Sequence, residues 1–171
     1  MLDWLLVTTV GNWRFARAAM AFAIVSAGFV GHASGVEPIS ISVAAALAYD
    51  DNQPVLKFEM RNLAKSPLEM YESNLPWGIQ ISTRLYAFEL DAEQTQLEEA
   101  LYIDDPGPNE IVLKPGAVLH GNIFLEWRFP SLLEVTKTHD VIVFWTYLPR
   151  SVNQVRGERF GGWVMVPRST E

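Results

Sequence analysis

Histidine, serine and cysteine are the side chains that most often carry nucleophilic catalysis or bind metal, and none occurs here in a supporting pattern. Downstream of residue 33 the only histidines are His120 and His139, whereas a zinc site typically uses three or four His, Cys or carboxylate ligands. Cysteine is absent, which excludes thiol catalysis and thiolate metal sites. The sequence has no Gly-x-Ser-x-Gly turn and no glycine-rich phosphate loop. We therefore expect no metal site and no cofactor.

Paired carboxylates are the remaining cue for an enzyme. The candidate pairs are Glu69/Glu72, Glu98/Glu99 and Asp104/Asp105. Acid–base catalysis needs two carboxyl groups whose surroundings separate their pKa values, whereas the polar neighbours of these pairs predict full solvation. The segment Glu89–Glu110 holds eight acidic residues and no Lys or Arg. It lacks the alternating Asp/Asn pattern of a calcium loop, so an ordinary solvated loop is favoured over a calcium site.

Aromatic residues near the C-terminus are the first candidates for binding. Trp145 and Tyr147 alternate on one face of an expected strand, and Trp163 lies on the following strand. If the opposite face forms the core, the three rings make an exposed platform for a sugar or a protein partner. The alternative, which the apolar character of both faces favours, is that these rings complete the core.

Arginine residues in the connection from Pro149 to Gly162 are the second candidates. Arg150, Arg156 and Arg159 lie there in an otherwise acidic chain. Long hairpin loops often carry recognition, and the guanidinium group suits carboxylate or phosphate acceptors. A mobile solvated loop remains the favoured alternative.

The beginning of the chain has the features of a secretory signal peptide. Arg14 and Arg17 precede an uncharged run of 14 residues, Ala18–Gly31, which is shorter than the roughly 20 residues of a membrane-spanning helix. We expect a helical signal peptide over residues 1–33 and a single domain over residues 34–171, either periplasmic or secreted. The apolar stretch Leu2–Val10 keeps open the alternative of an uncleaved anchor that tethers the domain to the membrane.

The remaining chain is acidic, and its charge limits the classes of partner. The net charge is −7 for the whole chain. Without residues 1–33 there are 11 basic and 19 acidic residues, a net charge of −8. Nucleic-acid affinity comes largely from neutralising phosphates, so we expect no nucleic-acid partner. We also expect no membrane span after signal cleavage.

Short alternating runs separated by proline-rich turns predict an all-β fold. The expected strands are Ile39–Tyr49, Leu56–Arg61, Leu68–Ser73, Ile79–Leu90, Ile111–Leu113, Ala117–Phe129, Asp140–Leu148 and Phe160–Val166. The first three are expected to form a meander. About seven to nine strands at this spacing favour an antiparallel immunoglobulin-like β-sandwich, with a small closed barrel as the alternative.

Three segments add a resemblance to a known family. They are Leu56-Lys57-Phe58-Glu59-Met60-Arg61-Asn62 with its Lys-Ser-Pro turn, Val112-Leu113-Lys114-Pro115-Gly116, and the strand that follows. Together they resemble bacterial immunoglobulin-like domains of the Bacillus intracellular proteinase inhibitor type. The resemblance spans about residues 39–128 and implies the fold; it assigns no inhibitory residue. Residues 75–78 and 144–147 are similar to segments of uncharacterised exported proteins of proteobacteria.

These features favour a non-catalytic binding module that holds a protein or glycan partner in the cell envelope. The expected binding residues are Trp145, Tyr147, Trp163, Arg150, Arg156 and Arg159. One alternative is an inhibitor or immunity-type protein that blocks an envelope enzyme, and a less favoured one is a carboxylate-dependent hydrolase.

Overall fold

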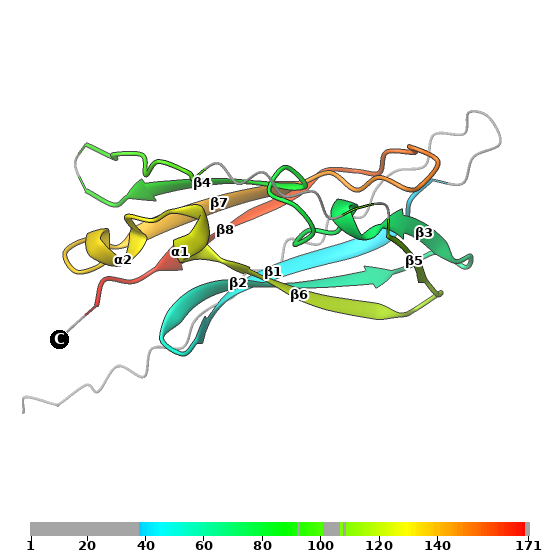
Figure 1. Ribbon diagram of the computed structural model, residues 1–171, viewed down its shortest axis with the longest axis horizontal. Coiled ribbons are helices and arrows are strands. Elements are labelled where there is room, and N and C mark those ends of the chain that lie inside the picture. Colours follow the sequence, from blue (N-terminus) through cyan, green and yellow to red (C-terminus); the bar gives the residue numbers. More distant parts are fainter. Residues whose placement is uncertain (1–37, 92, 101–106, 108, 170–171) are drawn as a thin grey trace, which may run out of the picture.

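The computed structural model describes residues 38–91, 93–100, 107 and 109–169, which form antiparallel β-strands with a few short helices. The strands are β1 Ile41–Asp50, β2 Gln53–Asn62, β3 Leu68–Tyr71, β4 Thr83–Glu89, β5 Glu110–Leu113, β6 Val118–Phe124, β7 Val141–Tyr147 and β8 Phe160–Val166. One sheet has the order β1-β2-β6, a second has the order β4-β7-β8, and β3 pairs with β5 in a two-stranded ribbon (Figure 1). The predicted all-β, antiparallel class is confirmed.

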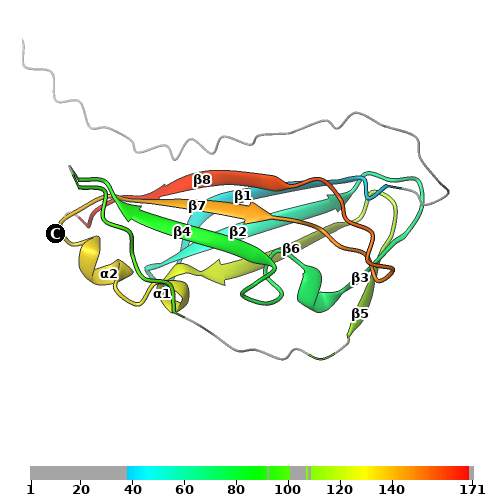
Figure 2. The same ribbon diagram turned by 90° about the horizontal axis from the view of Figure 1, so that it is seen from above.

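Alternate side chains of the two three-stranded sheets meet in one hydrophobic core. On β2, Phe58 and Met60 are buried while the intervening Glu59 is exposed. On β7, Val143 and Trp145 are buried in the same core. The Phe58 and Trp145 rings meet edge to face across the core, with centroids 5.3 Å apart. The two sheets therefore lie on opposite sides of the core, and β8 runs beside β1 at one margin (Figure 2).

The expected meander is only half present. β1 and β2 form the predicted hairpin, closed by Asp51 and Asn52 with positive φ angles of 45° and 64°. The third strand does not continue this sheet, because β3 pairs with β5. Residues 63–67 carry the chain away from β2, and β6 takes the position beside β2. The alternation of side chains predicts a strand but gives no information about its partner.

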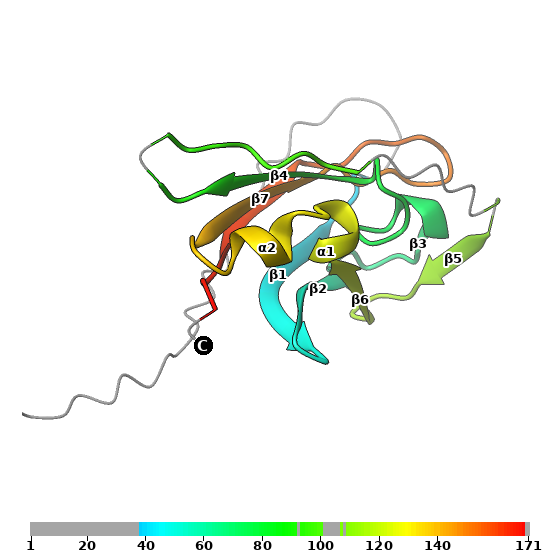
Figure 3. The same cartoon turned by 60° about the vertical axis from the view of Figure 1, so that its left-hand side comes forward.

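The predicted strand Ala117–Phe129 is wrong in its second half. β6 ends at Phe124, and the helices α1 (Leu125–Arg128) and α2 (Leu132–Val135) follow it at one end of the sheets (Figure 3). Leu125, Arg128, Phe129 and Leu132 are all buried. Their spacing of three, four and seven residues is helical, and a helical path turns them to one side.

Asn62 joins two segments that are distant in the sequence. It is almost completely buried, and its amide nitrogen donates hydrogen bonds to the carbonyl oxygens of Ser66 at 2.9 Å and Leu113 at 2.8 Å. Its side-chain oxygen accepts a hydrogen bond from the backbone N–H of Ala64 at 2.9 Å. A buried amide with its hydrogen bonds satisfied fixes geometry, so Asn62 ties the end of β2 to the end of β5.

The expected signal peptide lies outside the described residues. Among the residues described, no helix has the length and apolar character to cross a membrane.

Candidate functional site

The face of β7 that carries Trp145 and Tyr147 points into the core, so it does not form the exposed platform considered above. Trp145 and Tyr147 are only 5% and 1% exposed, so neither ring presents a binding surface. The Tyr147 hydroxyl donates a hydrogen bond to the Asn74 carbonyl at 2.8 Å. Burial raises the pKa of this phenol well above its usual range, so the hydroxyl remains a donor. The alternative that these rings complete the core is correct, and their placement in an exposed site is wrong.

The opposite face of the same sheet carries the exposed aromatic side chains. Tyr86 of β4 lies opposite Phe144 of β7, which lies opposite Trp163 of β8. Their exposed fractions are 42%, 40% and 52%. Neighbouring strands are about 4.8 Å apart, so three rings stand in one row across the whole sheet. Trp163 is thus the one predicted aromatic residue that lies at the surface.

A second row extends this surface. Phe88, Ile142 and Met165 lie opposite one another, two positions along the strands from the first row. Met165 is 47% exposed, and Phe88 packs edge to face on Phe144 with centroids 6.2 Å apart. We call the six side chains of the two rows the aromatic face. Contiguous exposed apolar side chains of this kind mark interaction sites more often than isolated ones do.

The predicted arginine loop is an ordered hairpin. Arg150 and Arg156 form an antiparallel bridge, and the backbone N–H of Gly157 donates to the Pro149 carbonyl at 3.0 Å. The backbone N–H of Val152 donates to the Glu69 carbonyl of β3 at 3.0 Å. These bonds close the connection into a hairpin that contacts β3.

The guanidinium groups of this hairpin are available at the surface. Arg150, Arg156 and Arg159 are exposed, and no ion pair joins any of them to another described residue. Thr83, Tyr147 and Phe160 lie opposite one another, so the hairpin leaves the sheet at the end where β4 begins. Arg84, which shares the outer face of β4 with Tyr86, lies at the same end. The aromatic face therefore has a basic border at this end.

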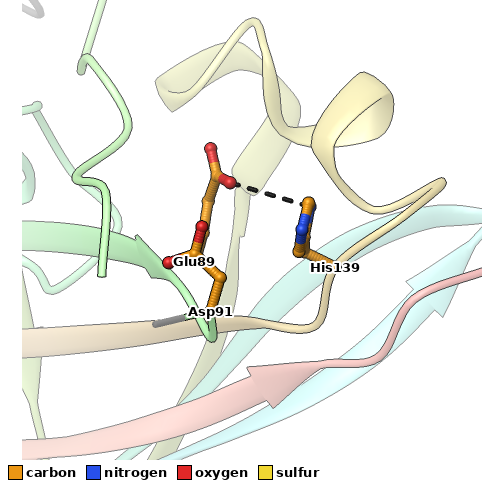
Figure 4. A group of neighbouring side chains, drawn as sticks. All are labelled: Glu89, Asp91 and His139. Atoms are coloured by element: carbon orange, nitrogen blue, oxygen red, sulfur yellow. Dashed lines mark ion pairs between the residues drawn. The ribbon is translucent and has the colours of Figure 1, made fainter. Parts of the chain in front are cut away.

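A group of possible metal ligands lies at the other end of β4. Glu89 ends this strand, Asp91 follows in the turn, and His139 precedes β7 (Figure 4). One ligand atom of each lies within 4.8 Å of the other two, and the Glu89 Oε2 to His139 Nδ1 distance is 3.7 Å. All three side chains are partly buried. We expected neither a metal site nor any association of the acidic segment with a histidine.

Among the described residues, the candidate carboxylate pairs do not line a common cleft. Glu69 and Glu72 are exposed, and Asp104/Asp105 lie outside the described residues. Glu99 forms an ion pair with the buried Arg128, whose Nε lies 2.7 Å from Glu99 Oε1. A surface depression of about 320 Å³ near Asn62 and Ser151 has Glu69 as its single titratable lining residue. It therefore does not offer the two carboxyl groups that glycoside hydrolysis commonly uses.

The side chain of Arg128 also donates hydrogen bonds to the backbone at the beginning of β4. Its Nη2 donates to the carbonyl oxygens of Gln80 at 3.2 Å and Thr83 at 3.1 Å. Sequence reasoning missed this residue because arginine is rarely buried. The one available signal is its helical spacing from Leu125 and Leu132.

The chain matches no protein-family model and no curated protein sequence.

Proposed function

We propose that this chain is an exported, non-catalytic binding module whose aromatic face docks on a protein partner. The observation that carries the proposal is the row Tyr86, Phe144 and Trp163, half-exposed on three adjacent strands of one sheet. Removing apolar surface from water stabilises a protein by about 25 cal/mol per Å², and the exposed row does not contribute this free energy while it faces water. A partner that covers the row recovers that energy.

The chemistry of the surface favours a protein over a glycan. Phe88, Ile142 and Met165 flank the row on one side with apolar groups that offer no strong hydrogen-bond donor or acceptor, and Arg84 and Thr146 flank it on the other. Sugars offer hydroxyl groups that need polar partners beside the stacking ring. Aromatic residues and methionine are typical of the centre of protein–protein interfaces, where charged groups are depleted.

The basic border of the aromatic face favours a partner with acidic groups at its own margin. Arg84 and the hairpin residues Arg150, Arg156 and Arg159 lie at the end of the sheet where β4 begins. This basic cluster belongs to a chain whose net charge is −7. Opposite charges at the rim of an interface raise the association rate and fix the orientation of the partners. We infer that the partner presents an apolar patch bordered by Asp or Glu side chains.

An immunoglobulin-like β-sandwich is the fold that we propose for this module. Two antiparallel sheets packed over one core are compatible with it. The Asn62 bonds join two of the segments on which the family resemblance depends, the end of β2 and the Leu113 turn. The proposed location is the periplasm or the outside of the cell, after removal of residues 1–33. N-terminal sequencing of the exported protein tests this: a first residue near Ser34 supports cleavage, and a start at Met1 contradicts it.

An inhibitor or immunity-type protein is the second candidate, and the ordered hairpin favours it. A hairpin held by backbone bonds to Glu69 and by its own bridge loses little entropy when it enters the cleft of an enzyme. In that case the hairpin, and not the aromatic face, would carry the affinity. Replacing Arg150, Arg156 and Arg159 by Glu would then abolish inhibition of the target enzyme, while replacing Trp163 would leave inhibition unchanged.

Photo-crosslinking in the cells that produce the protein tests the main proposal. A photoreactive amino acid is placed at position 163, on the aromatic face, or at position 127 as the control. Trp127 of α1 is 58% exposed and stacks on Phe124, so it is a comparable aromatic residue on a different element. We expect a protein adduct from position 163 and none from position 127. Adducts to polysaccharide alone would support the glycan alternative, and equal adducts from both positions would contradict the proposal.

A further inference from the structure

We propose that Glu89, Asp91 and His139 bind one divalent transition-metal ion, which fastens the end of β4 to the turn between α2 and β7. This site is separate from the aromatic face and does not depend on the proposed function. It combines an imidazole nitrogen with two carboxylate oxygens, and these come from two segments that are far apart in the sequence.

The three side chains are already arranged around a common point. One ligand atom of each lies within 4.8 Å of the other two, and Glu89 Oε2 lies 3.7 Å from His139 Nδ1 (Figure 4). Bonds of about 2.0–2.2 Å from an ion to nitrogen and oxygen ligands place neighbouring ligand atoms roughly 3–3.6 Å apart. A shift of the ligand atoms by about 1 Å, through rotation of the side chains, therefore suffices to bring them to bonding distance of one ion.

The backbone holds the two segments together without an ion. The N–H of Leu90, between the two acidic ligands, donates to the Asp140 carbonyl at 2.8 Å. The N–H of His139 donates to the Val135 carbonyl of α2 at 3.0 Å. The Thr138 hydroxyl lies 2.9 Å from His139 Nδ1, and this contact is exchanged for the ion when Nδ1 binds it. A preformed arrangement of this kind lowers the conformational cost of binding.

The charges at the site favour a cation. Two carboxylates stand close together, and no Lys or Arg among the described residues forms an ion pair with Glu89 or Asp91. The side chain of Glu89 is only 18% exposed, so solvent screens its charge incompletely. The backbone N–H groups of Glu93 and Gln94 donate to Asp91 Oδ1 at 3.0 and 2.6 Å, and a divalent ion would supply the full positive charge that these dipoles do not.

The donor set decides which ion fits. Ca²⁺ and Mg²⁺ take oxygen ligands almost exclusively, whereas an imidazole nitrogen with carboxylates suits ions such as Zn²⁺ and Mn²⁺. Three protein ligands leave at least one position for water or for a group of a partner. Zn²⁺ is therefore the ion we expect to bind most tightly, with Mn²⁺ weaker in accordance with the usual order of affinities.

Calorimetric titration of the purified full-length chain with ZnCl₂, free of any affinity tag, tests the site. We expect one equivalent to bind, and we expect His139→Ala and Glu89→Gln each to weaken binding by about tenfold or more. Two substitutions serve as controls and should leave the affinity unchanged. They are His120→Ala, at an exposed histidine of β6, and Glu93→Gln, at an exposed acid two residues after Asp91.

A second measurement keeps the test independent of any folding defect. Mn²⁺ added to the wild-type chain should broaden the amide NMR signals of residues 89–91 and 138–140 and leave those around His120 sharp. Circular dichroism of each variant without metal checks that it is folded. Absence of Zn²⁺ binding, an unchanged affinity in folded His139→Ala, or equal losses in the His120 and His139 variants would overturn the proposal.

Discussion

Truncating the two tryptophans of neighbouring strands tests which face of the second sheet is buried. Trp145 is 5% exposed and contacts Phe58 across the core, whereas Trp163 is 52% exposed. Truncation of a buried Phe or Trp to Ala costs about 3–5 kcal/mol, through lost burial and the cavity left behind. Trp163→Ala loses only cross-strand contacts, at about 1 kcal/mol or less. The two variants should therefore differ by roughly 2–4 kcal/mol in the free energy of unfolding.

Urea denaturation followed by far-UV circular dichroism measures this difference. We expect the midpoint of Trp163→Ala to lie close to that of the wild type and that of Trp145→Ala to fall sharply, with similar slopes. The total stability of a domain is about 5–15 kcal/mol, and a loss at the upper end of the expected range leaves too little folded Trp145→Ala to measure. Trp145→Phe, which keeps an aromatic ring, then replaces it and should still be the less stable variant. Equal losses, or a larger loss from Trp163→Ala, would refute the assignment of the aromatic face.

Two further predictions concern the buried polar side chains that hold the sheets together. Asn62→Ala removes three hydrogen bonds of a residue that is 1% exposed. At about 1 kcal/mol for each bond, we expect the free energy of unfolding to fall by about 3 kcal/mol in thermal or urea denaturation. A fall of less than about 1 kcal/mol would contradict this role of Asn62. Arg128→Met removes the hydrogen bonds from Arg128 Nη2 to the carbonyl oxygens of Gln80 and Thr83, while Glu99, whose side chain is 30% exposed, rehydrates. The expected loss is about 2–4 kcal/mol, and unchanged stability would show that the ion pair and its bonds do not support α1.

Alternation in the sequence predicts the strands well where one face is polar. Lys57, Glu59 and Arg61 mark the exposed face of β2, and the structure buries the residues between them. The same reasoning cannot orient β7, because Ile142 and Phe144 on one face are as apolar as Val143 and Trp145 on the other. The choice depends on which face meets β2, and that is a tertiary contact.

The end of β6 illustrates a second limit. Ile123, Leu125, Trp127 and Phe129 alternate as in a strand, yet Leu125, Phe129 and Leu132 also fit a helix. Short apolar runs satisfy both periods, and the packing of α1 against β2 decides between them. The buried Arg128 is a consequence of that helical turn, so a strand assignment could not find it.

The two candidate sites differ in how much of them the sequence could reveal. Trp163 and the three arginines of the hairpin were predicted from their types, and the structure adds Tyr86, Phe144 and Arg84 through strand register. Glu89 and Asp91 belong to an acidic segment that the sequence singles out, but His139 joins them only through the pairing of Glu89 with Val141. Register between strands distant in the chain is the information that the sequence alone lacks.

The central claim is that the aromatic face docks on a protein, and the affinity for the partner identified by crosslinking tests it most directly. Residues at the centre of an interface typically cost 2 kcal/mol or more when truncated to Ala, so Trp163→Ala should weaken binding by roughly thirtyfold or more in a calorimetric titration. Trp127→Ala, at an exposed tryptophan of α1, should bind as the wild type does. Wild-type affinity of a folded Trp163→Ala variant would contradict the account.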